Sequence, residues 1–334
     1  MKIAVLGSGG WGTALALLLL GNGHDVFLWS HSEERAQEMA HTRVNPMLKG
    51  IFLPETLGIT SDMEAAVAGA GMVVSAVPSY AVGDMAKTMA RVIAPGVAVV
   101  SVSKGIERNT GLRLTQVIAA ELGEKNPVSA LCGPSHAEEV AKGMPTACVA
   151  ASPDRNVAEW VQDAFMNERF RVYTSPDLIG AELGAALKNV VALCCGVCDG
   201  MGFGDNTRAM LMTRGLAEMA RLGVALGGLR ETFGGLTGVG DLIVTCTSMH
   251  SRNRRAGILI GQGHSPEEAM RRVGAVVEGY YATDNARFLA QKAGVDMPIV
   301  KAAYQVLYEG GDVNHMMEEL MRRTRKHEIE ESWT

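Results

Sequence analysis

The first thirty residues combine a short apolar strand, a glycine-rich turn, a helix and a second strand. KIAVLG, residues Lys2–Gly7, is apolar and partly β-branched, and GSGGWG, residues Gly7–Gly12, follows it directly as G-x-G-x-x-G. TALALLLLGNG then predicts a helix ending at Gly21 or Gly23, and DVFLW, residues Asp25–Trp29, predicts the next strand. This order and spacing are typical of the βαβ unit that opens a dinucleotide-binding fold.

The glycines of this turn have separate expected tasks. Gly7 permits the tight turn, Gly9 lets the backbone approach a pyrophosphate, and Gly12 lets the helix pack closely on the sheet. The N-terminus of the helix supplies free N–H groups and the positive end of its dipole for the phosphates. The alternative is an ordinary strand–turn–helix crossover without a ligand.

The end of the second strand bears on the choice of cofactor. An acid at this place binds the adenosine ribose hydroxyls of NAD. Here the strand ends in Ser30-His31-Ser32, and Glu33 and Glu34 fall inside the next expected helix. Because no acid stands at the strand end to repel a 2′-phosphate, and because His31 and Arg35 are placed to attract one, we expect NADP or NAD to bind, with NADPH preferred. For His31 the alternative is a residue that merely precedes a helix.

Strands and helices continue to alternate up to Pro176. Further strands are predicted at Met72–Val77, Val97–Val102, Val128–Cys132, Thr146–Ala151 and Phe170–Tyr173, and a helix at Tyr80–Ile93. The alternation predicts an α/β fold with a Rossmann-like, doubly wound, mostly parallel sheet over residues 1–176. Beyond Pro176 the apolar spacing becomes helical, which predicts an all-helical second domain over residues 177–334. Its expected helices include Asn206–Leu226, Glu267–Val273, Thr283–Lys292 and Ile299–Tyr308.

One expected helix, SPDLIGAELGAALKNVVALCCGV from Ser175 to Val197, is apolar nearly all round. Ser175 is the expected cap and Pro176 suits the first helical position. Lys188 stands in this apolar setting beside Asn189. Burial lowers the pKa of a lysine, which suits it to general acid–base catalysis. A lysine that reaches water, or that pairs with a carboxylate for structural reasons, is the alternative.

Other polar residues follow expected strands or glycines. Lys104, in SKGIE, follows the strand Val97–Val102 at its carboxyl end, where ligands bind in open α/β sheets. Ser135 begins a predicted capping box with Glu138. Asp241 lies in a glycine-lined turn, where an acid is often no more than a turn residue.

A basic stretch, HSRNRRAG, follows this turn. It contains Arg252, Arg254 and Arg255 around Asn253, and we interpret it as a basic loop. An arginine fork suits a phosphate, although such loops are often only solvated surface.

Composition excludes several classes of protein. With 47% apolar and 20% charged residues the chain is globular, and a net charge of −5 argues against a general nucleic-acid binder. Continuous apolar runs are too short for a membrane span, and the N-terminus is a strand rather than a signal peptide. Six cysteines in apolar surroundings predict reduced thiols in the cytoplasm. Cys195 and Cys198 form a C-x-x-C pair without a second pair or a nearby histidine, so we expect no metal.

Eight motifs together resemble the bacterial NAD(P)-dependent sn-glycerol-3-phosphate dehydrogenases. They occur in the family's order and cover nearly the whole chain: GSGGWGTALA, SKGIE, GPSHAEEVA, ELGAALKNVVAL, GFGDNTRAMLMTRGLAEM, GLTGVGDLIVTCTS, SRNRRAG and VVEGYYAT. The family reduces dihydroxyacetone phosphate to sn-glycerol 3-phosphate for phospholipid synthesis. Departures are few: Ala185 stands where a glycine is frequent, Cys132 where a serine is frequent, and Cys194-Cys195 replace other small or apolar residues.

The resemblance implies roles for individual residues. Lys188 is the implied general base in oxidation and acid in reduction, and Lys104 and Asp241 flank the reacting hydroxyl as further catalytic and substrate-binding residues. The implied substrate pocket also contains Gly133, Ser135, Ser251, Arg252 and Asn253. The implied cofactor contacts, besides the glycines, are Gly10, Trp11, His31, Lys104, Ala137, Arg252, Val276 and Glu278. A small-molecule substrate and a homodimer are expected.

Two rival interpretations remain open. The first is another two-domain dehydrogenase, for a β-hydroxyacid or a sugar phosphate such as phosphogluconate. SRNRR and LTGVGDL favour glycerol 3-phosphate over these substrates. The second rival is a non-catalytic NADP-sensing module, which needs neither a buried Lys188 nor a phosphate clamp.

Overall fold

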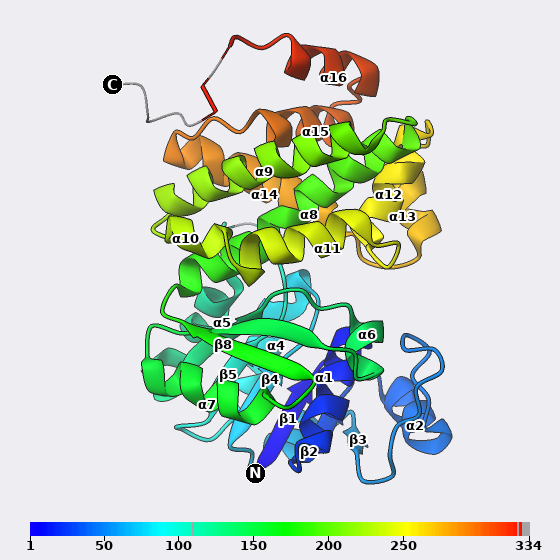
Figure 1. Cartoon of the computed structure of the whole chain (residues 1–334). Coiled ribbons are helices and arrows are strands. Elements are labelled where there is room, and N and C mark those ends of the chain that lie inside the picture. Colours follow the sequence, from blue (N-terminus) through cyan, green and yellow to red (C-terminus); the bar gives the residue numbers. More distant parts are fainter. Residues whose placement is uncertain (109, 326, 329–334) are drawn as a thin grey trace.

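The computed structural model describes residues 1–108, 110–325, 327 and 328. An eight-stranded sheet forms one half of the molecule and helices form the other (Figure 1). The strands are β1 Lys2–Leu6, β2 Asp25–Trp29, β3 Gly58–Thr60, β4 Met72–Ser75, β5 Ala98–Ser101, β6 Val128–Cys132, β7 Thr146–Ala151 and β8 Phe170–Ser175. Their spatial order is β3-β2-β1-β4-β5-β6-β7-β8, and every neighbouring pair is parallel except β6 and β7. The predicted doubly wound, mostly parallel sheet is confirmed.

Helices cover both faces of the sheet. They are α1 Gly10–Gly21, α2 Glu33–Thr42, α3 Met63–Val67, α4 Val82–Met89, α5 Leu114–Leu122, α6 Ala137–Ala141 and α7 Arg155–Phe165. Side chains of α1 and α7 pack with those of β1 and β2 in one apolar cluster, and side chains of α3, α4 and α5 form a second cluster. Burial on both faces explains why the central strands are almost wholly apolar.

Every element after β8 is helical, as predicted, within the described residues. The helices are α8 Leu178–Gly200, α9 Asp205–Ala225, α10 Arg230–Phe233, α11 Asp241–Thr247, α12 Arg252–Gly261, α13 Pro266–Val273, α14 Glu278–Ala293, α15 Pro298–Tyr308 and α16 Val313–Met321. They surround α8, the central helix of this half (Figure 1). By length and hydropathy α8 could cross a membrane, but 83% of its most apolar window is buried inside the protein. It is therefore the core helix of the helical half.

Some predicted boundaries were wrong. The side chain of Asp177, not Ser175, caps α8 by accepting a hydrogen bond from the N–H of Gly180, and the helix continues to Gly200 rather than ending near Val197. The stretch SRNRRAG is not a loop, because Arg252 begins α12. This helix packs closely on α8, because a Cβ on Gly257 of α12 would lie 2.1 Å from the carbonyl oxygen of Leu193 in α8. Glycine at this position permits the close approach.

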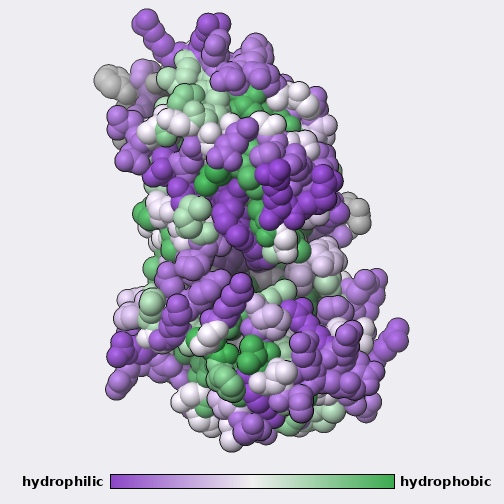
Figure 2. Space-filling view, turned by 90° about the vertical axis from the view of Figure 1, so that its right-hand side faces the viewer, coloured by the Kyte–Doolittle hydropathy of each residue, from purple (hydrophilic) through white to green (hydrophobic). Residues whose placement is uncertain are grey.

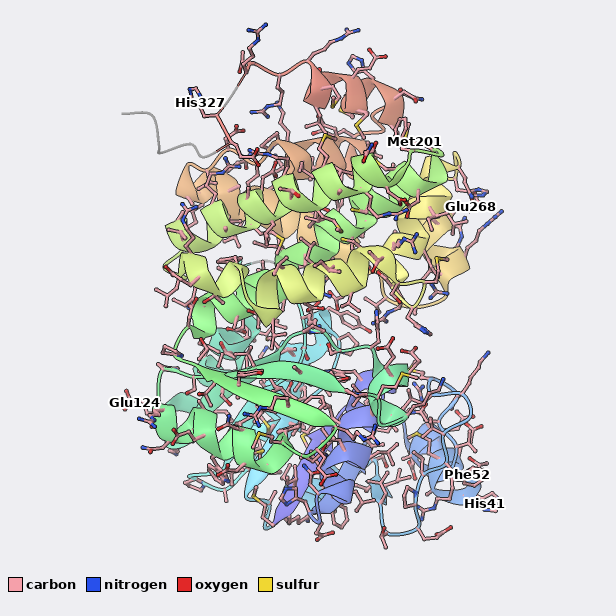
Figure 3. The ribbon with its side chains drawn as sticks, viewed as in Figure 1. His41, Phe52, Glu124, Met201, Glu268 and His327 are labelled. Carbon is pink, nitrogen blue, oxygen red and sulfur yellow. The ribbon has the colours of Figure 1, made fainter. Side chains whose placement is uncertain are left out.

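Two polar contacts join the halves. Buried Glu182 of α8 accepts hydrogen bonds from the N–H of Thr115, at 2.9 Å, and from Arg113. Glu278, the first residue of α14, accepts a 2.7 Å hydrogen bond from the hydroxyl of Ser79, which follows β4. Figure 3 places Glu124 and His41 on the sheet half, and Met201, Glu268 and His327 on the helical half. Between the halves the surface is hollowed (Figure 2).

Candidate active site

Lys188 lies in the middle of α8 and is 4% exposed. Its ammonium nitrogen lies 2.9 Å from Oδ1 of Asp241 and donates a 2.6 Å hydrogen bond to the hydroxyl of Thr245. Burial lowers the pKa of Lys188 to about 8, although the carboxylate of Asp241 opposes the shift. Lys104 adds to the lowering, because its positive charge disfavours a second one nearby. At neutral pH this amine is protonated yet close to its titration range, which suits proton transfer.

Asp241 connects the two lysines. Its Oδ2 lies 2.7 Å from the ammonium nitrogen of Lys104, while its Oδ1 faces Lys188. Burial disfavours ionisation of this carboxyl, but the two ammonium groups more than compensate and hold its pKa below the usual value. The prediction that Asp241 lies in a turn was wrong, because Asp241 is the first residue of α11, directly after the π-helical turn Leu236–Gly240.

Lys104 makes two further hydrogen bonds on the sheet side of the site. It donates to the carbonyl oxygen of Gly133 at 2.9 Å and to the hydroxyl of Ser135 at 2.6 Å. Ser135 donates in turn to the same Gly133 carbonyl, at 2.9 Å. Its predicted capping box with Glu138 was wrong: His136 precedes α6 as its cap residue, and no side chain caps that helix. The Ser135 hydroxyl therefore belongs to the lysine cluster.

A chain of amides fixes the residue after Lys188. Asn253 donates a 2.9 Å hydrogen bond to the side-chain oxygen of Asn189, and its own side-chain oxygen accepts the N–H of Gly279 at 2.8 Å. Ser251, 4% exposed, caps α12 by accepting the N–H of Arg254. Both Ser251 and Asn253 are thus engaged within the protein, and both lie on α12 or at its cap, against α8.

Arg252 differs from its neighbours. Arg254 is held by Asp199, with 2.7 Å between Nε and Oδ2, whereas the guanidinium of Arg252 has no hydrogen-bond or ion-pair partner among the described residues. Arg252 is exposed and lies in the electrostatic field of Glu278. An unpaired planar fork of this kind is available to bind a phosphate in a bidentate manner.

The glycine-rich turn has the geometry that a dinucleotide requires. Gly7 has φ +126°, and a Cβ there would lie 2.5 Å from the carbonyl oxygen of Ala76. A Cβ on Gly12 would lie 2.0 Å from the carbonyl oxygen of Gly7, whereas one on Gly9 would meet nothing within 4 Å. No side chain caps α1, and no acid lies in its first turn. The free N–H groups and the open space at Gly9 fit a pyrophosphate.

Neighbouring residues complete the surroundings of this turn. A Cβ on Gly10 would lie 3.6 Å from the Cβ of Ala137, so the start of α6 borders the N-terminus of α1. The indole N–H of Trp11 is buried and has no hydrogen-bond partner among the described residues. Such an orphaned donor is costly unless a ligand or water accepts from it. Gly10, Trp11 and Ala137, three of the predicted cofactor contacts, therefore lie at or near the N-terminus of α1.

The end of β2 carries no acid. Ser30 is fully buried and its hydroxyl accepts a 2.9 Å hydrogen bond from Ser8. His31 is exposed, and Arg35 lies in the first turn of α2. Two further predicted cofactor residues belong to the helical half: Val276 lies just before α14, and Glu278 is its first residue. Burial raises the pKa of Glu278, although its hydrogen bonds with Ser79 oppose this.

Three contributors were not predicted. Thr245 lies one helical turn after Asp241, and that i, i+4 spacing was a usable signal. Asn45 is fully buried and donates to the carbonyl of Ser8 at 3.0 Å and to the hydroxyl of Thr13 at 2.7 Å, so it supports the glycine-rich turn. Ser79 lies opposite Glu278. The last two depend on contacts between segments far apart in the chain.

Family models, sequence relatives and a solved structure all match this chain to the same family. Residues 2–158 and 177–318 match the family models described as the N-terminus and C-terminus of NAD-dependent glycerol-3-phosphate dehydrogenase. A glycerol-3-phosphate dehydrogenase [NAD(P)+] from Moorella thermoacetica is 54% identical over 98% of both chains, and one from Fusobacterium nucleatum is 49% identical over 100% of both. The crystal structure of a glycerol-3-phosphate dehydrogenase from Coxiella burnetii matches with a TM-score of 0.93 and 39% identity, over 96% of this chain and 99% of that one.

Proposed function

The chain belongs to the NAD-dependent glycerol-3-phosphate dehydrogenase family, and we propose that Lys188 is the proton-transfer group of its reaction. The enzyme is an NAD(P)-dependent oxidoreductase that interconverts dihydroxyacetone phosphate and sn-glycerol 3-phosphate. Its product supplies phospholipid synthesis. The observation that carries our proposal is a buried lysine with a lowered pKa that is ion-paired with Asp241 and hydrogen-bonded to Thr245, both on α11.

Each residue of the site has a separate role in the proposed reaction. The glycine-rich turn at the N-terminus of α1 would hold the nicotinamide cofactor, which would supply the hydride for the substrate carbonyl carbon in the reduction and accept it in the oxidation. In the reduction, the ammonium of Lys188 donates its proton to the oxygen that becomes the hydroxyl. In the oxidation, neutral Lys188 accepts that proton while the hydride leaves. Lys104 and Asp241 flank the reacting oxygen beside Lys188 in this proposal. The ammonium of Lys104 stabilises the negative charge that develops on this oxygen, and Asp241 holds the two ammonium groups in place.

The phosphate of the substrate is assigned to α12. Arg252 is the principal clamp, because its guanidinium is exposed and unpaired among the described residues. Ser251, Asn253, Gly133 and Ser135 form the surrounding pocket in this proposal. Arg252 also contacts the cofactor, together with Lys104, Val276 and Glu278. The division of the chain into a cofactor domain, residues 1–176, and a substrate domain, residues 177–334, is part of the same proposal.

We propose that NADPH is preferred over NADH. The absence of an acid at the end of β2, where Ser30 is buried and His31 is exposed, supports this preference. We also propose that the enzyme works in the cytoplasm as a homodimer. All six cysteines are free thiols, which suits a reducing compartment. Exposed apolar side chains on and near α9, α10 and α11, including Val224, Leu229 and Ile243, are available for a subunit contact.

The proposal can be tested with the purified enzyme. Oxidation of NADPH and NADH is followed with dihydroxyacetone phosphate and, separately, with a panel of β-ketoacids and sugar phosphates. We expect turnover with dihydroxyacetone phosphate alone and a lower KM for NADPH. Faster turnover of a ketoacid would replace the assigned substrate, and cofactor binding without any turnover would favour a sensing module.

A further inference from the structure

The segment that carries Lys104 is anchored in the opposite half of the molecule. Lys104 follows β5 of the sheet, but Ile106, two residues later, is 3% exposed and belongs to the apolar core of the helical half. Other members of that core include Leu187 of α8 and Ala286 of α14. Lys104 is therefore fixed between the sheet on one side and an anchor in the helices on the other.

A buried amide holds this anchor. Asn285 of α14 is 3% exposed, and its side-chain nitrogen donates a 2.9 Å hydrogen bond to the carbonyl oxygen of Ile106. In the sequence of α14, Asn285 is followed by Ala286 and, one turn later, by Leu289, both of which belong to the apolar core. A buried amide donor in such surroundings is retained where its partner needs a fixed position.

The same face of α14 holds the segment at a second point. A Cβ on Gly105 would lie 2.5 Å from the Cβ of Ser79, so Gly105 is closely packed against that residue. Ser79 is itself held by Glu278, through a 2.7 Å hydrogen bond from its hydroxyl. Glu278 and Asn285 are seven residues apart, which places them two turns apart on one face of α14. One helix face therefore holds the backbone on the C-terminal side of Lys104.

α14 also contacts the backbone beside Lys188. A Cβ on Gly279 would lie 2.5 Å from the carbonyl oxygen of Asn189, and the N–H of Gly279 donates to Asn253, which in turn donates to Asn189. The helix therefore touches the segments of both lysines, although neither lysine side chain contacts it in any hydrogen bond or ion pair among the described residues.

We propose that Asn285 is a positioning residue which, through the carbonyl of Ile106, holds Lys104 in its ion pair with Asp241. This inference rests on the proposed roles of Lys104 and Lys188 in the reaction. The amide acts at a distance from the substrate, and its effect passes entirely through the Lys104 backbone. Loss of the hydrogen bond releases the segment, so the Lys104 ammonium moves away from Asp241.

The test uses Asn285→Leu, which keeps the branching at Cγ and removes the donor, and Asn285→Asp, which keeps both size and shape, should the larger leucine fold poorly. In a crystal structure of either variant, we expect the distance between Lys104 Nζ and Asp241 Oδ2 to exceed hydrogen-bonding range. We expect kcat to fall ~10–100-fold, as for a small misplacement of a reacting group. The KM for the cofactor should stay near the parent value while kcat falls.

The pH profile gives a readout that a purely structural role would not move. The charge of Lys104 helps to lower the pKa of Lys188, so its displacement should raise that pKa. The other charged or titratable groups that act on Lys188 are Asp241 and Cys246 of α11 and His136 before α6. None of these contacts Asn285 in any interaction of the described residues. The pH at which reduction loses half its rate should therefore move upward.

A double-mutant cycle and a matched control complete the experiment. In a Lys104→Met background, Asn285→Leu should cost almost nothing further in kcat. Asn126 is a matched control, since it is 6% exposed and donates to the carbonyls of Ala94 and Val97, away from the site. Asn126→Leu should lower thermal stability and leave the pH profile in place.

The outcomes separate the two proposals. Independent, multiplicative losses from Asn285→Leu and Lys104→Met, or a pH profile like that of Asn126→Leu, would overturn the positioning role. An unchanged Lys104–Asp241 distance in the crystal would overturn it as well. If the parent enzyme does not reduce dihydroxyacetone phosphate at all, the assigned function fails, while the crystallographic distance still decides the role of Asn285.

Discussion

Lys188 and Asp241 form a buried ion pair in which the carboxylate is shared with a second cation. The nitrogen of Lys188 lies 2.9 Å from Oδ1, while Oδ2 lies 2.7 Å from the nitrogen of Lys104. The side chains of Lys188 and Asp241 are 5% and 1% exposed. Two ammonium groups on one carboxylate leave one positive charge uncompensated, and a site of that sign favours the oxyanion that develops during carbonyl reduction.

Replacement of Lys188 by methionine separates a catalytic from a structural lysine. Methionine is unbranched, apolar and of similar length, so Lys188→Met should fold, and loss of a buried charge need not lower stability. Turnover should fall by ~10²–10⁴ for lost acid–base catalysis. Melting temperature, NADPH affinity and single-turnover rate are measured on one preparation.

Lys301→Met is the matched control, because Lys301 is exposed on α15. It should keep normal turnover. Near-normal turnover in folded Lys188→Met, with a lowered melting temperature, would show that Lys188 has a structural role only.

The sheet and the helical half were predictable from the sequence because their patterns are local. Strand β2 was predicted at its observed bounds, and β6 and β7 likewise, since short apolar runs bounded by glycine and polar residues determine them. The errors lie at the ends of elements, and the start of α8 is an example. Asp177 and Ser175 are both suitable caps by residue type, and only the packing of the chain selects Asp177, whose other oxygen accepts the N–H of Leu229, 52 residues away.

The site was predictable only as far as single motifs reach. Lys188, Lys104 and Asp241 each stood in a recognisable motif, but nothing in their spacing places one carboxylate between two lysines. Asn45 and Asn285 illustrate the limit: each is an ordinary polar residue in the sequence, and its importance comes from a carbonyl 37 or 179 residues away. Such contacts require the fold.

His31→Asp tests the basis of cofactor choice. A carboxylate at the exposed end of β2 should repel the 2′-phosphate of NADPH, and at about 4 Å each pair of charges in water is worth about 1 kcal/mol. The KM for NADPH should therefore rise roughly tenfold, while the KM for NADH stays near the parent value. Initial rates with both cofactors at saturating substrate measure the ratio.

His41→Asp makes the same change at the last turn of α2, on an exposed residue (Figure 3). It should leave the NADPH/NADH ratio as in the parent. A parent-like ratio in His31→Asp too would exclude His31 from cofactor discrimination.

Arg252→Lys tests the phosphate clamp. The substitution keeps the charge but loses the planar fork, so it should weaken capture of dihydroxyacetone phosphate by about 10–100-fold, as for a lost hydrogen bond to a charged group. Because Arg252 is also assigned to the cofactor, both KM values are measured.

Arg254→Lys is the control for this change, since Arg254 stands two residues away and is committed to Asp199 and the carbonyl of Thr247. Arg254→Lys should lower the melting temperature and leave both KM values near those of the parent. If Arg252→Lys leaves both KM values as they were, Arg252 does not belong to the site.

Glu218→Gln tests a pH-dependent contribution to stability away from the site. Glu218 is 3% exposed and accepts the N–H groups of Ile299 and Val300 at the start of α15. Burial raises its pKa from 4.5 to about 7, against the effect of those N–H groups. Because the folded-state pKa is above the unfolded one, this contribution is present below pH 4.5 and is lost as the pH rises through 7.

The free energy of unfolding of the parent should thus decline over this range relative to Glu218→Gln, by on the order of 3 kcal/mol. Urea titrations at several pH values measure the difference. Exposed Glu124→Gln is the control and should follow the parent (Figure 3). Parallel stability curves for the parent and Glu218→Gln would show that Glu218 titrates normally.

Asp241→Asn tests the electrostatic link between the carboxylate and Lys188 through the pH dependence of both directions of the reaction. Reduction requires protonated Lys188, so its rate should fall as the pH rises through about 8, and oxidation, which requires the neutral amine, should rise over the same range. Asp241 raises the pKa of Lys188, whereas Lys104 lowers it. The amide removes the attraction between Asp241 and Lys188 and leaves the repulsion between Lys104 and Lys188. The pH at which the reduction rate falls and the pH at which the oxidation rate rises should therefore both be lower than in the parent, opposite to the shift expected for Asn285→Leu. Rates per folded molecule are required, because two ammonium groups without a carboxylate destabilise the protein. If the pH profiles of Asp241→Asn in both directions match those of the parent, the titrating group is not Lys188.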